Sequence, residues 1–198
     1  MDLPELYILR HGETEWNAEH RMQGVLDSPL TAKGRAQAVA MGRMLAAAGV
    51  TADSHAVISS PQGRARITAD LVAKAFVGQV TVDARLREIS VGEWGGLTRA
   101  QIEEKWPAAR AVDHFLDFYA MAPGGDGFDA MWTRAQDFLR TVTAPTIVVT
   151  HGITSRVLRT AAMGYGIERL DELPGGQGVI FRLANGEHTT LGQQGLQP

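Results

Sequence analysis

The sequence predicts an α/β protein, a three-layer α/β/α arrangement with a mostly parallel central sheet and an inserted helical cap. Three observations lead to this fold class. Short apolar runs at 6–9, 56–59 and 146–150 lack polar alternation, which is typical of strands covered on both faces. Helical stretches separate these runs, as connections between parallel strands require. The stretch 98–143 breaks this rhythm with further helical segments divided by Pro107.

The first long helix is expected within residues 30–49. Thr31 can serve as its N-cap through the side-chain oxygen, and Gly49 can end it in a left-handed conformation. The apolar stripe expected to face the sheet consists of Ala36, Val39, Ala40 and Leu45.

The second long helix is expected within residues 60–76, after the strand at 56–59. Ser60 is its predicted N-cap, and Pro61 is at the first helical position, where the missing N–H group is not needed. A further strand is predicted near 79–86 because of the alternating pattern QVTV.

The last helix is predicted over 151–164, directly after the strand at 146–150. A strand at 178–183 should continue through an Asn-Gly turn into a hairpin partner. The interrupting stretch is expected to contain two or three helical segments, in LTRAQIEEKW, AARAVDHFLDFY and FDAMWTRAQDFLRTV. We interpret about 98–129 as a cap inserted into a single domain of residues 1–198, with the last of these helices packed on the sheet.

The composition limits the compartment and the partners. The chain contains no cysteine, which excludes disulfides and thiolate chemistry and favours a cytoplasmic location. No segment approaches the roughly 20 apolar residues of a membrane span. A net charge of -3 speaks against a broad surface for nucleic acid. We therefore expect a small-molecule ligand and no membrane or nucleic-acid partner. Whether the chain forms a homodimer stays open.

Two predicted strands end in similar sequences, LRHG and VTHG. Because ligands bind beyond the carboxyl ends of parallel strands, side chains at these ends are expected to share a cleft. An arginine from the second long helix and a glutamate from the loop LREISVGEWGGL can join them. The candidate site therefore consists of Arg10, His11, Arg64, Glu88 and His151.

Each candidate also has a structural alternative. A single histidine is most often a surface residue or a satisfied core residue, which is our interpretation of His20, His55, His114 and His188. Arg64 and Glu88 could form a structural ion pair. The joint placement of histidine and arginine at strand ends favours a catalytic role.

Four ordered blocks resemble the histidine phosphatase superfamily, also called the phosphoglycerate mutase-like family. They are LRHGETEWN with RMQGVLDSPLTAKGRAQA, SSPQGRARITADLV, LREISVGEWGGLT and VVTHGITSRVL. The resemblance, to the short broad-specificity phosphatases in particular, implies that His11 is a nucleophile and Glu88 the proton donor. The residues it implies for phosphate or substrate binding are Arg10, Thr14, Asn17, Gln23, Gly24, Arg64 and His151.

These residue types suit phosphoryl transfer. The transferred group spreads negative charge over three oxygens, which arginine's permanently charged fork can hold. Neighbouring arginines disfavour the imidazolium form of His11, and a backbone carbonyl is the usual acceptor for its second ring nitrogen. Two steps through a phosphohistidine are expected, with Glu88 as acid and then as base. The scheme requires no cofactor and no metal, since adjacent arginines would repel a dication.

Three functions stay open from the sequence. A phosphomonoester hydrolase is favoured over a cofactor-dependent phosphoglycerate mutase. For the mutase, the resemblance implies a longer cap with paired arginines and commonly an asparagine where this chain has Ile153. A non-catalytic phospholigand-binding protein would use the same pocket. A pocket for a small or apolar leaving group could be lined by Trp94, Phe115, Phe118, Tyr119 and Met121. The alternative is that these side chains only pack within the cap.

Overall fold

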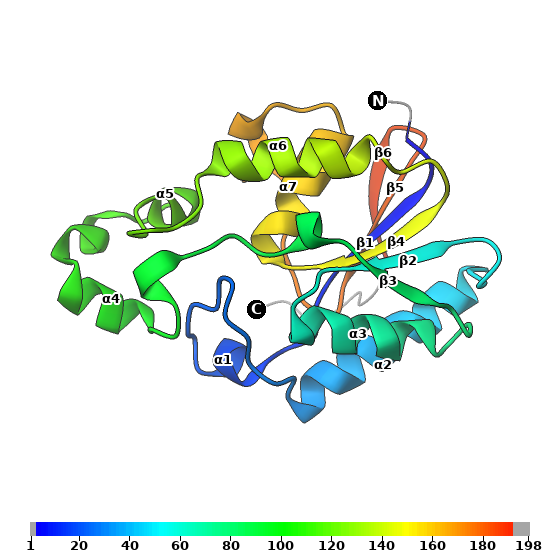
Figure 1. Cartoon of the computed structure of the whole chain (residues 1–198), viewed down its shortest axis with the longest axis horizontal. Helices are drawn as coiled ribbons and strands as arrows, with labels where there is room; N and C mark the ends of the chain where they lie inside the picture. Colours follow the sequence, from blue (N-terminus) through cyan, green and yellow to red (C-terminus); the bar gives the residue numbers. More distant parts are fainter. Residues whose placement is uncertain (1–2, 192–198) are drawn as a thin grey trace.

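The computed structural model describes residues 3–191, which form a six-stranded sheet (Figure 1). The strands are β1 (Leu6–Arg10), β2 (Ala56–Ser59), β3 (Val80–Val82), β4 (Thr146–Thr150), β5 (Ile180–Ala184) and β6 (Glu187–Leu191). Their order is β3-β2-β4-β1-β5-β6. The first four strands of this order are mutually parallel, and β5 is antiparallel to both β1 and β6. The predicted mostly parallel sheet is confirmed.

Helices cover both faces of the sheet (Figure 1). One face carries α2 (Ala32–Ala47) and α3 (Gly63–Ala73), and the other carries α6 (Phe128–Leu139) and α7 (Gly152–Ala162). The three-layer arrangement is therefore confirmed. The connections contain α1 (Glu15–Ala18), α4 (Arg99–Lys105), α5 (Phe115–Ala120) and the 3₁₀ helices η1 (Ala84–Leu86), η2 (Gly92–Trp94), η3 (Pro107–Ala111) and η4 (Ile167–Arg169).

The buried stripe of α2 differs from the predicted one. Thr31 caps this helix as expected, by accepting a hydrogen bond from the Gly34 N–H group. Ala36 and Ala40 are exposed, however, and the buried residues are Gly34, Ala38, Met41, Gly42 and Leu45. The glycines of this helix face the neighbouring chain, because the two backbones approach each other closely there. A stripe chosen only from the larger apolar side chains therefore identifies the wrong face of the helix.

The predicted start of α3 was wrong. Gln62 is the N-cap, so Ser60 and Pro61 precede the helix. The Ser60 hydroxyl lies 2.7 Å from His151 Nε2, a contact between two strand ends that a local capping pattern does not reveal. The second predicted cap helix also differs, because 107–111 forms a 3₁₀ turn before α5 begins.

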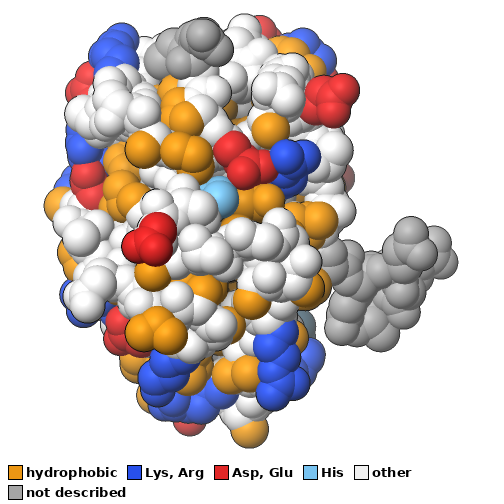
Figure 2. Space-filling view, turned by 90° about the vertical axis from the view of Figure 1, so that its right-hand side faces the viewer, with side chains coloured by type: hydrophobic (Ala, Val, Ile, Leu, Met, Phe, Trp, Pro, Cys, Tyr) orange, Lys and Arg blue, Asp and Glu red, His pale blue; other side chains and the backbone are white. Residues whose placement is uncertain are grey.

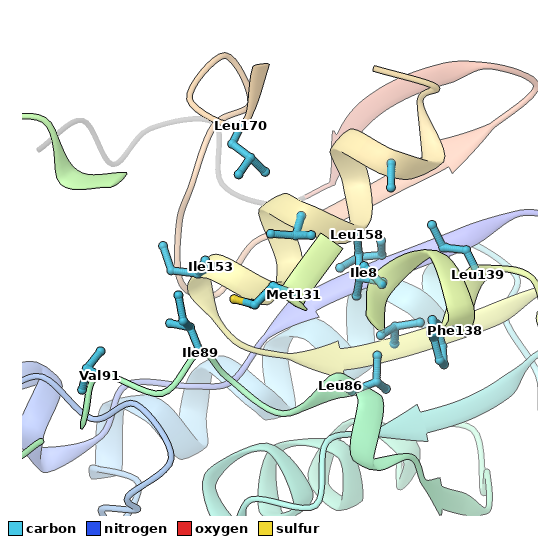
Figure 3. Packing of buried hydrophobic residues seen from close by; sticks show 14 of the residues in the cluster. Ile8, Leu86, Ile89, Val91, Met131, Phe138, Leu139, Ile153, Leu158 and Leu170 are labelled. Atoms are coloured by element: carbon cyan, nitrogen blue, oxygen red, sulfur yellow. The ribbon is translucent and has the colours of Figure 1, made fainter. Parts of the chain in front are cut away.

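The core is divided by the sheet. Leu6 and Ile8 of β1 belong to the apolar cluster under α6 and α7, and Tyr7 and Leu9 belong to the cluster under α2 and α3. This alternation follows from the two-residue period of a strand. Figure 3 shows the first cluster, in which Ile8 lies near Leu158 of α7. The interpretation of β1 as a strand buried on both faces is therefore confirmed.

The helices α4 and α5 and the turn η3 stand beyond the carboxyl ends of the parallel strands (Figure 1). Ile102, Ala109 and Phe118 from this segment are buried in the same cluster as the residues under α6 and α7. Apolar contact therefore fixes the segment over the end of the sheet. We keep 98–129 as the proposed bounds of a cap insertion.

Residues 3–191 contain no helix long and apolar enough to cross a membrane. Figure 2 shows the face of the molecule at the right-hand side of Figure 1, away from α4 and α5. Lysine, arginine, aspartate and glutamate side chains are interspersed there with hydrophobic ones. This face lacks the broad basic area that binds nucleic-acid backbones.

Gly34 provides a test of the close approach between α2 and the chain that follows His11. A Cβ atom at position 34 would lie 2.0 Å from the Glu13 carbonyl oxygen, so the backbone would have to move. We expect Gly34→Ala to lower the free energy of unfolding by about 1–3 kcal/mol, measured by urea denaturation. The control is Gly127→Ala, where an added Cβ meets nothing within 4 Å. Equal stability of the two variants would contradict the packing described.

Candidate active site

The structure brings the five predicted site residues to the carboxyl end of the sheet. The ring centroids of His11 and His151 are 5.2 Å apart, and Arg64 Nε lies 3.2 Å from His11 Nε2. A cavity of about 70 Å³ is lined by residues that include Arg10, His11, Arg64 and Glu88. Those four of the five residues line this cavity, whereas His151 is fully buried and is not in its lining.

The protonation of His11 is fixed by its two neighbours. Its Nδ1 lies 2.8 Å from the Gly12 carbonyl oxygen, which can only accept, so Nδ1 carries the proton. Its Nε2 accepts from the Arg64 Nε–H group. Burial first, and then the charges of Arg10 and Arg64, hold the pKa of His11 well below its ordinary value of 6.5. His11 is a neutral imidazole that lines the cavity, with its Nε2 lone pair accepting from Arg64.

Arg64 is held rigidly by the loop that precedes α2. Its Nη1 donates to the Leu26 carbonyl at 2.5 Å and to Asp27 Oδ1 at 3.1 Å, and its Nη2 donates to the Gly24 carbonyl at 2.8 Å. The side chain is buried, and burial lowers its pKa. These contacts position a cationic donor at His11 Nε2. Sequence reasoning did not identify Asp27.

Arg10 differs from Arg64 in its contacts. Its Nε is buried and has no hydrogen-bond partner among residues 3–191. Burial lowers the pKa of Arg10, and the charge of Glu88 opposes that change. A buried guanidinium with an unmet donor is suited to bind an anion that enters beside His11.

His151 is oriented by Ser60. The Ser60 hydroxyl accepts from the Gln62 N–H group at 3.3 Å, so its own proton can be donated to His151 Nε2 at 2.7 Å. That donation places the ring proton of neutral His151 on Nδ1, which is buried without a partner in the described part of the chain. Burial, followed by the charge of Arg64, lowers the pKa of His151 well below 6.5. In this tautomer Nδ1–H is a donor without a partner among residues 3–191, although His151 does not line the 70 Å³ cavity.

Glu88 is fixed by the first turn of α7. Its Oε2 accepts from the Ile153 N–H group at 3.1 Å. Its Oε1 accepts from the N–H and the hydroxyl of Thr154 at 3.0 and 2.9 Å, and from the Ile89 N–H group at 3.0 Å. Helix N-terminal N–H groups are suitable partners for a carboxylate. The side chain is buried but lines the cavity.

Gln62 connects two parts of the site and was missed from the sequence. Its Oε1 accepts from the Glu88 N–H group at 2.7 Å, and its Nε2 donates to the Gly24 carbonyl at 3.0 Å. The N-cap of α3 thereby couples the loop that holds Arg64 to the loop that carries Glu88. No local pattern marks this role, because the partners are distant in sequence.

The remaining predicted binding residues fall into two groups. Asn17, Gln23 and Gly24 line the 70 Å³ cavity. Thr14 is buried as the N-cap of α1, and its hydroxyl accepts from Asn17 N–H at 3.1 Å and from Gln23 Nε2 at 2.8 Å. Thr14 is thus placed to orient its two neighbours.

A second cavity of about 300 Å³ adjoins the first and shares Arg10, Glu88 and Tyr119 with it. Phe115 and Tyr119 line it, as predicted for the aromatic residues of the cap. Burial, followed by the charge of Glu88, raises the pKa of Tyr119 to about 12, so its phenol is neutral. The other three predicted lining residues do not line it: Trp94 and Phe118 are buried in the core, and Met121 is exposed.

Comparisons with known proteins agree with this geometry. The family model described as "Histidine phosphatase superfamily (branch 1)" matches residues 6–190. The probable phosphoglycerate mutase GpmB of Citrobacter koseri is 36% identical over 168 residues, which are 81% of this chain and 75% of that relative.

Two solved structures cover nearly the whole chain. The mycobacterial glucosyl-3-phosphoglycerate phosphatase in complex with VO3 has a TM-score of 0.79 at 30% identity, covering 91% of each chain. The Bacillus stearothermophilus protein YhfR has a TM-score of 0.77 at 34% identity, covering 98% of each chain.

The orientation of His151 by Ser60 is testable by NMR. In Ser60→Ala we expect the Nδ1–H tautomer of His151 to lose its preference, because the donor to Nε2 is gone, and stability to fall by about 1 kcal/mol. Long-range ¹H–¹⁵N spectra of the imidazole measure the tautomer. Ser54→Ala is the matched control, since its hydroxyl lies 2.8 Å from the Nδ1 of another histidine, His55. An unchanged His151 tautomer in Ser60→Ala would refute the assignment.

The two buried neutral histidines make stability depend on pH. Their folded pKa values lie below 6.5, so protons bind the unfolded chain more readily. This stability is complete above 6.5 and decreases as pH falls toward the folded values. We expect wild-type unfolding free energy to be lower at about pH 5.5 than at about pH 7.5. His151→Asn should reduce this difference in unfolding free energy, and the control His20→Asn, at an exposed position, should keep it. Equal differences in the wild type and both variants would contradict this pH dependence.

Proposed function

The chain belongs to the histidine phosphatase superfamily, and from this membership and its site we propose that it is a phosphomonoester hydrolase acting through a phosphohistidine on His11. The observation that carries the proposal is the state of His11: a neutral ring that lines the small cavity, with Nδ1–H bound to the Gly12 carbonyl and Nε2 accepting from Arg64. Glu88, on the same cavity, is the proposed general acid and base.

In the first step, the phosphoryl oxygens of the ester are held by Arg10, Arg64 and His151. The Arg64 Nε–H group moves from His11 Nε2 to a phosphoryl oxygen, which frees the nitrogen lone pair. Nε2 attacks phosphorus, the bond from phosphorus to the ester oxygen breaks, and Glu88, which enters this step as the neutral acid, gives its proton to that oxygen. The products are the free alcohol and phosphohistidine.

In the second step, Glu88 takes a proton from a water molecule that attacks phosphorus. The bond between phosphorus and Nε2 breaks, inorganic phosphate forms, and His11 Nδ1 keeps its proton, which stays hydrogen-bonded to the Gly12 carbonyl. Arg10 and Arg64 stabilise the charge on the transferred group in both steps, because their guanidinium groups already line the cavity before it arrives. Neither step uses a metal or a cofactor.

The hydrolase is favoured over a mutase by the residue after the second His-Gly. Ile153 is 5% exposed, and its N–H group is occupied by Glu88. Its side chain cannot donate a hydrogen bond to a second anionic substrate held for return transfer. The ligand class proposed is a small phosphomonoester, and the cytoplasm is the proposed compartment.

Replacing the nucleophile and the acid should have different effects. We expect His11→Ala to lower phosphate release from any ester by at least about 10³-fold. Glu88→Gln should lower turnover of glycerol 3-phosphate by about 10²–10⁴-fold, because an alkoxide needs a proton to leave. With p-nitrophenyl phosphate the same variant should give a burst about equal to the enzyme concentration, since p-nitrophenolate leaves unprotonated and only the water step is slow.

The control for these assays is Glu93→Gln, at an exposed position near Glu88 in sequence. A chelator in every assay tests metal independence at the same time. Wild-type kinetics in Glu88→Gln with both esters would remove Glu88 from the mechanism. Conversion of 3-phosphoglycerate to 2-phosphoglycerate without phosphate release would assign a mutase, and tight phosphate binding without turnover of any ester would assign a binding protein.

A further inference from the structure

The 300 Å³ cavity beside Glu88 lies where the leaving group of the proposed reaction would be, and Arg156 of α7 lines it. We propose that Arg156 binds an anionic group, a carboxylate or a second phosphate, on the alcohol portion of the substrate. This inference rests on the proposed function and narrows its substrate class. It also replaces the expectation of an apolar leaving group.

One edge of the Arg156 guanidinium is hydrogen-bonded, and the other edge has no hydrogen-bond partner among the described residues. Its Nη1 donates to the carbonyl oxygens of Leu170 and Leu173, which fixes the side chain. Its Nε and Nη2 make no hydrogen bond to any residue of the described chain. Nη2 lies against Gly175, which lines the same cavity. The open edge presents the two parallel N–H donors that match a carboxylate or a phosphate.

The charges around the cavity favour an anion. Arg10, Arg156 and Arg159 line it, and Glu88, whose oxygens already accept four hydrogen bonds, is the acidic residue in its lining. Arg159 is fully buried, and its N–H groups meet the Ser155 and Pro174 carbonyls and the His188 ring rather than a carboxylate. Burial, followed by the charge of Arg156, lowers its pKa to about 9.

Burial, followed by the charge of Arg10, lowers the pKa of Arg156, and Asp171, which is outside the cavity lining, opposes that change. The Asp171 carboxylate lies 3.5 Å from His114 Nε2, on the side of α5. The lining itself therefore retains an excess of positive charge. A bound anion offsets that charge at the open edge of Arg156.

The size and walls of the cavity limit the leaving group. At roughly 30 Å³ for each water-sized group, the volume holds about ten non-hydrogen atoms. Phe115 faces the Arg156 guanidinium with the ring centroid 5.0 Å from Cζ, and Tyr119 and Phe181 complete apolar walls. A short carbon chain that ends in an anion fits these walls. The substrate class is the phosphomonoester of a small hydroxy acid or of a small diol phosphate.

The test uses esters that differ only in the distal group. 3-Phosphoglycerate and glycerol 3-phosphate differ by a carboxylate and a hydroxymethyl group, and glycerol 1,3-bisphosphate carries a second phosphate at the same position. We expect kcat/KM of the wild-type enzyme to be about 10–100-fold higher for 3-phosphoglycerate than for glycerol 3-phosphate. An advantage of the bisphosphate instead would identify phosphate as the anion. Equal values for all three esters would overturn the inference.

Two variants address Arg156 directly. Arg156→Met should bring the ratio of kcat/KM for the anionic and neutral esters to within about threefold of one. Gly175→Ala keeps every charge, but its Cβ would lie 2.8 Å from Arg156 Nη2 and displace the guanidinium, so the ratio should fall here too. This second variant decides the matter if Arg156→Met does not fold. The control is Arg140→Met, where an exposed arginine paired with Asp137 is removed and the ratio should not change.

The possible failures are distinguishable. If no ester releases phosphate, or if release persists in His11→Ala, the proposed function fails. If release depends on His11 but the ratio is unchanged in both Arg156→Met and Gly175→Ala, the hydrolase stands and the role of Arg156 is refuted.

Discussion

The site depends on buried positive charge placed around an uncharged histidine. Arg10 has an unmet buried donor, and the acidic partner of Arg64 is Asp27, whose side chain is 42% exposed. Burying such groups is unfavourable unless they are hydrogen-bonded, and the backbone carbonyls of the 24–26 loop supply those bonds to Arg64. The same charges lower the pKa of His11. The proposed phosphate binding and the neutral state of His11 therefore have one physical cause.

The fold meets this requirement by joining strand ends to helix starts. His11 and His151 directly follow β1 and β4, Arg64 lies in the first turn of α3, and the first turn of α7 holds Glu88. The smaller cavity collects the proposed reacting groups. The larger one, between α5 and α7, is where substrates would be selected. In the proposed mechanism, side chains at sheet and helix termini carry out the chemistry, and the cap with α7 selects the ester.

Much of this arrangement could be predicted from the sequence, because it follows from short-range patterns. Apolar runs located the parallel strands, and the strand-end rule grouped Arg10, His11 and His151. Contacts between distant segments could not be predicted in this way: the Ser-Pro pattern at Ser60 indicates a helix cap, whereas its hydroxyl bonds to a histidine 91 positions later. Arg156 was missed as well. Its spacing from Gly152 and Arg159 on one face of a helix was the available signal.

The most direct test of the account is the identity of the phosphorylated residue. Enzyme mixed with excess ester, quenched in alkali within a turnover and digested should yield a peptide that carries a phosphoryl group on His11, detected by mass spectrometry. The adduct should be stable in alkali and lost in acid, as expected for phosphohistidine. Phosphate release with no adduct at His11, or with the phosphoryl group on His151 instead, would contradict the assignment of His11 as the nucleophile.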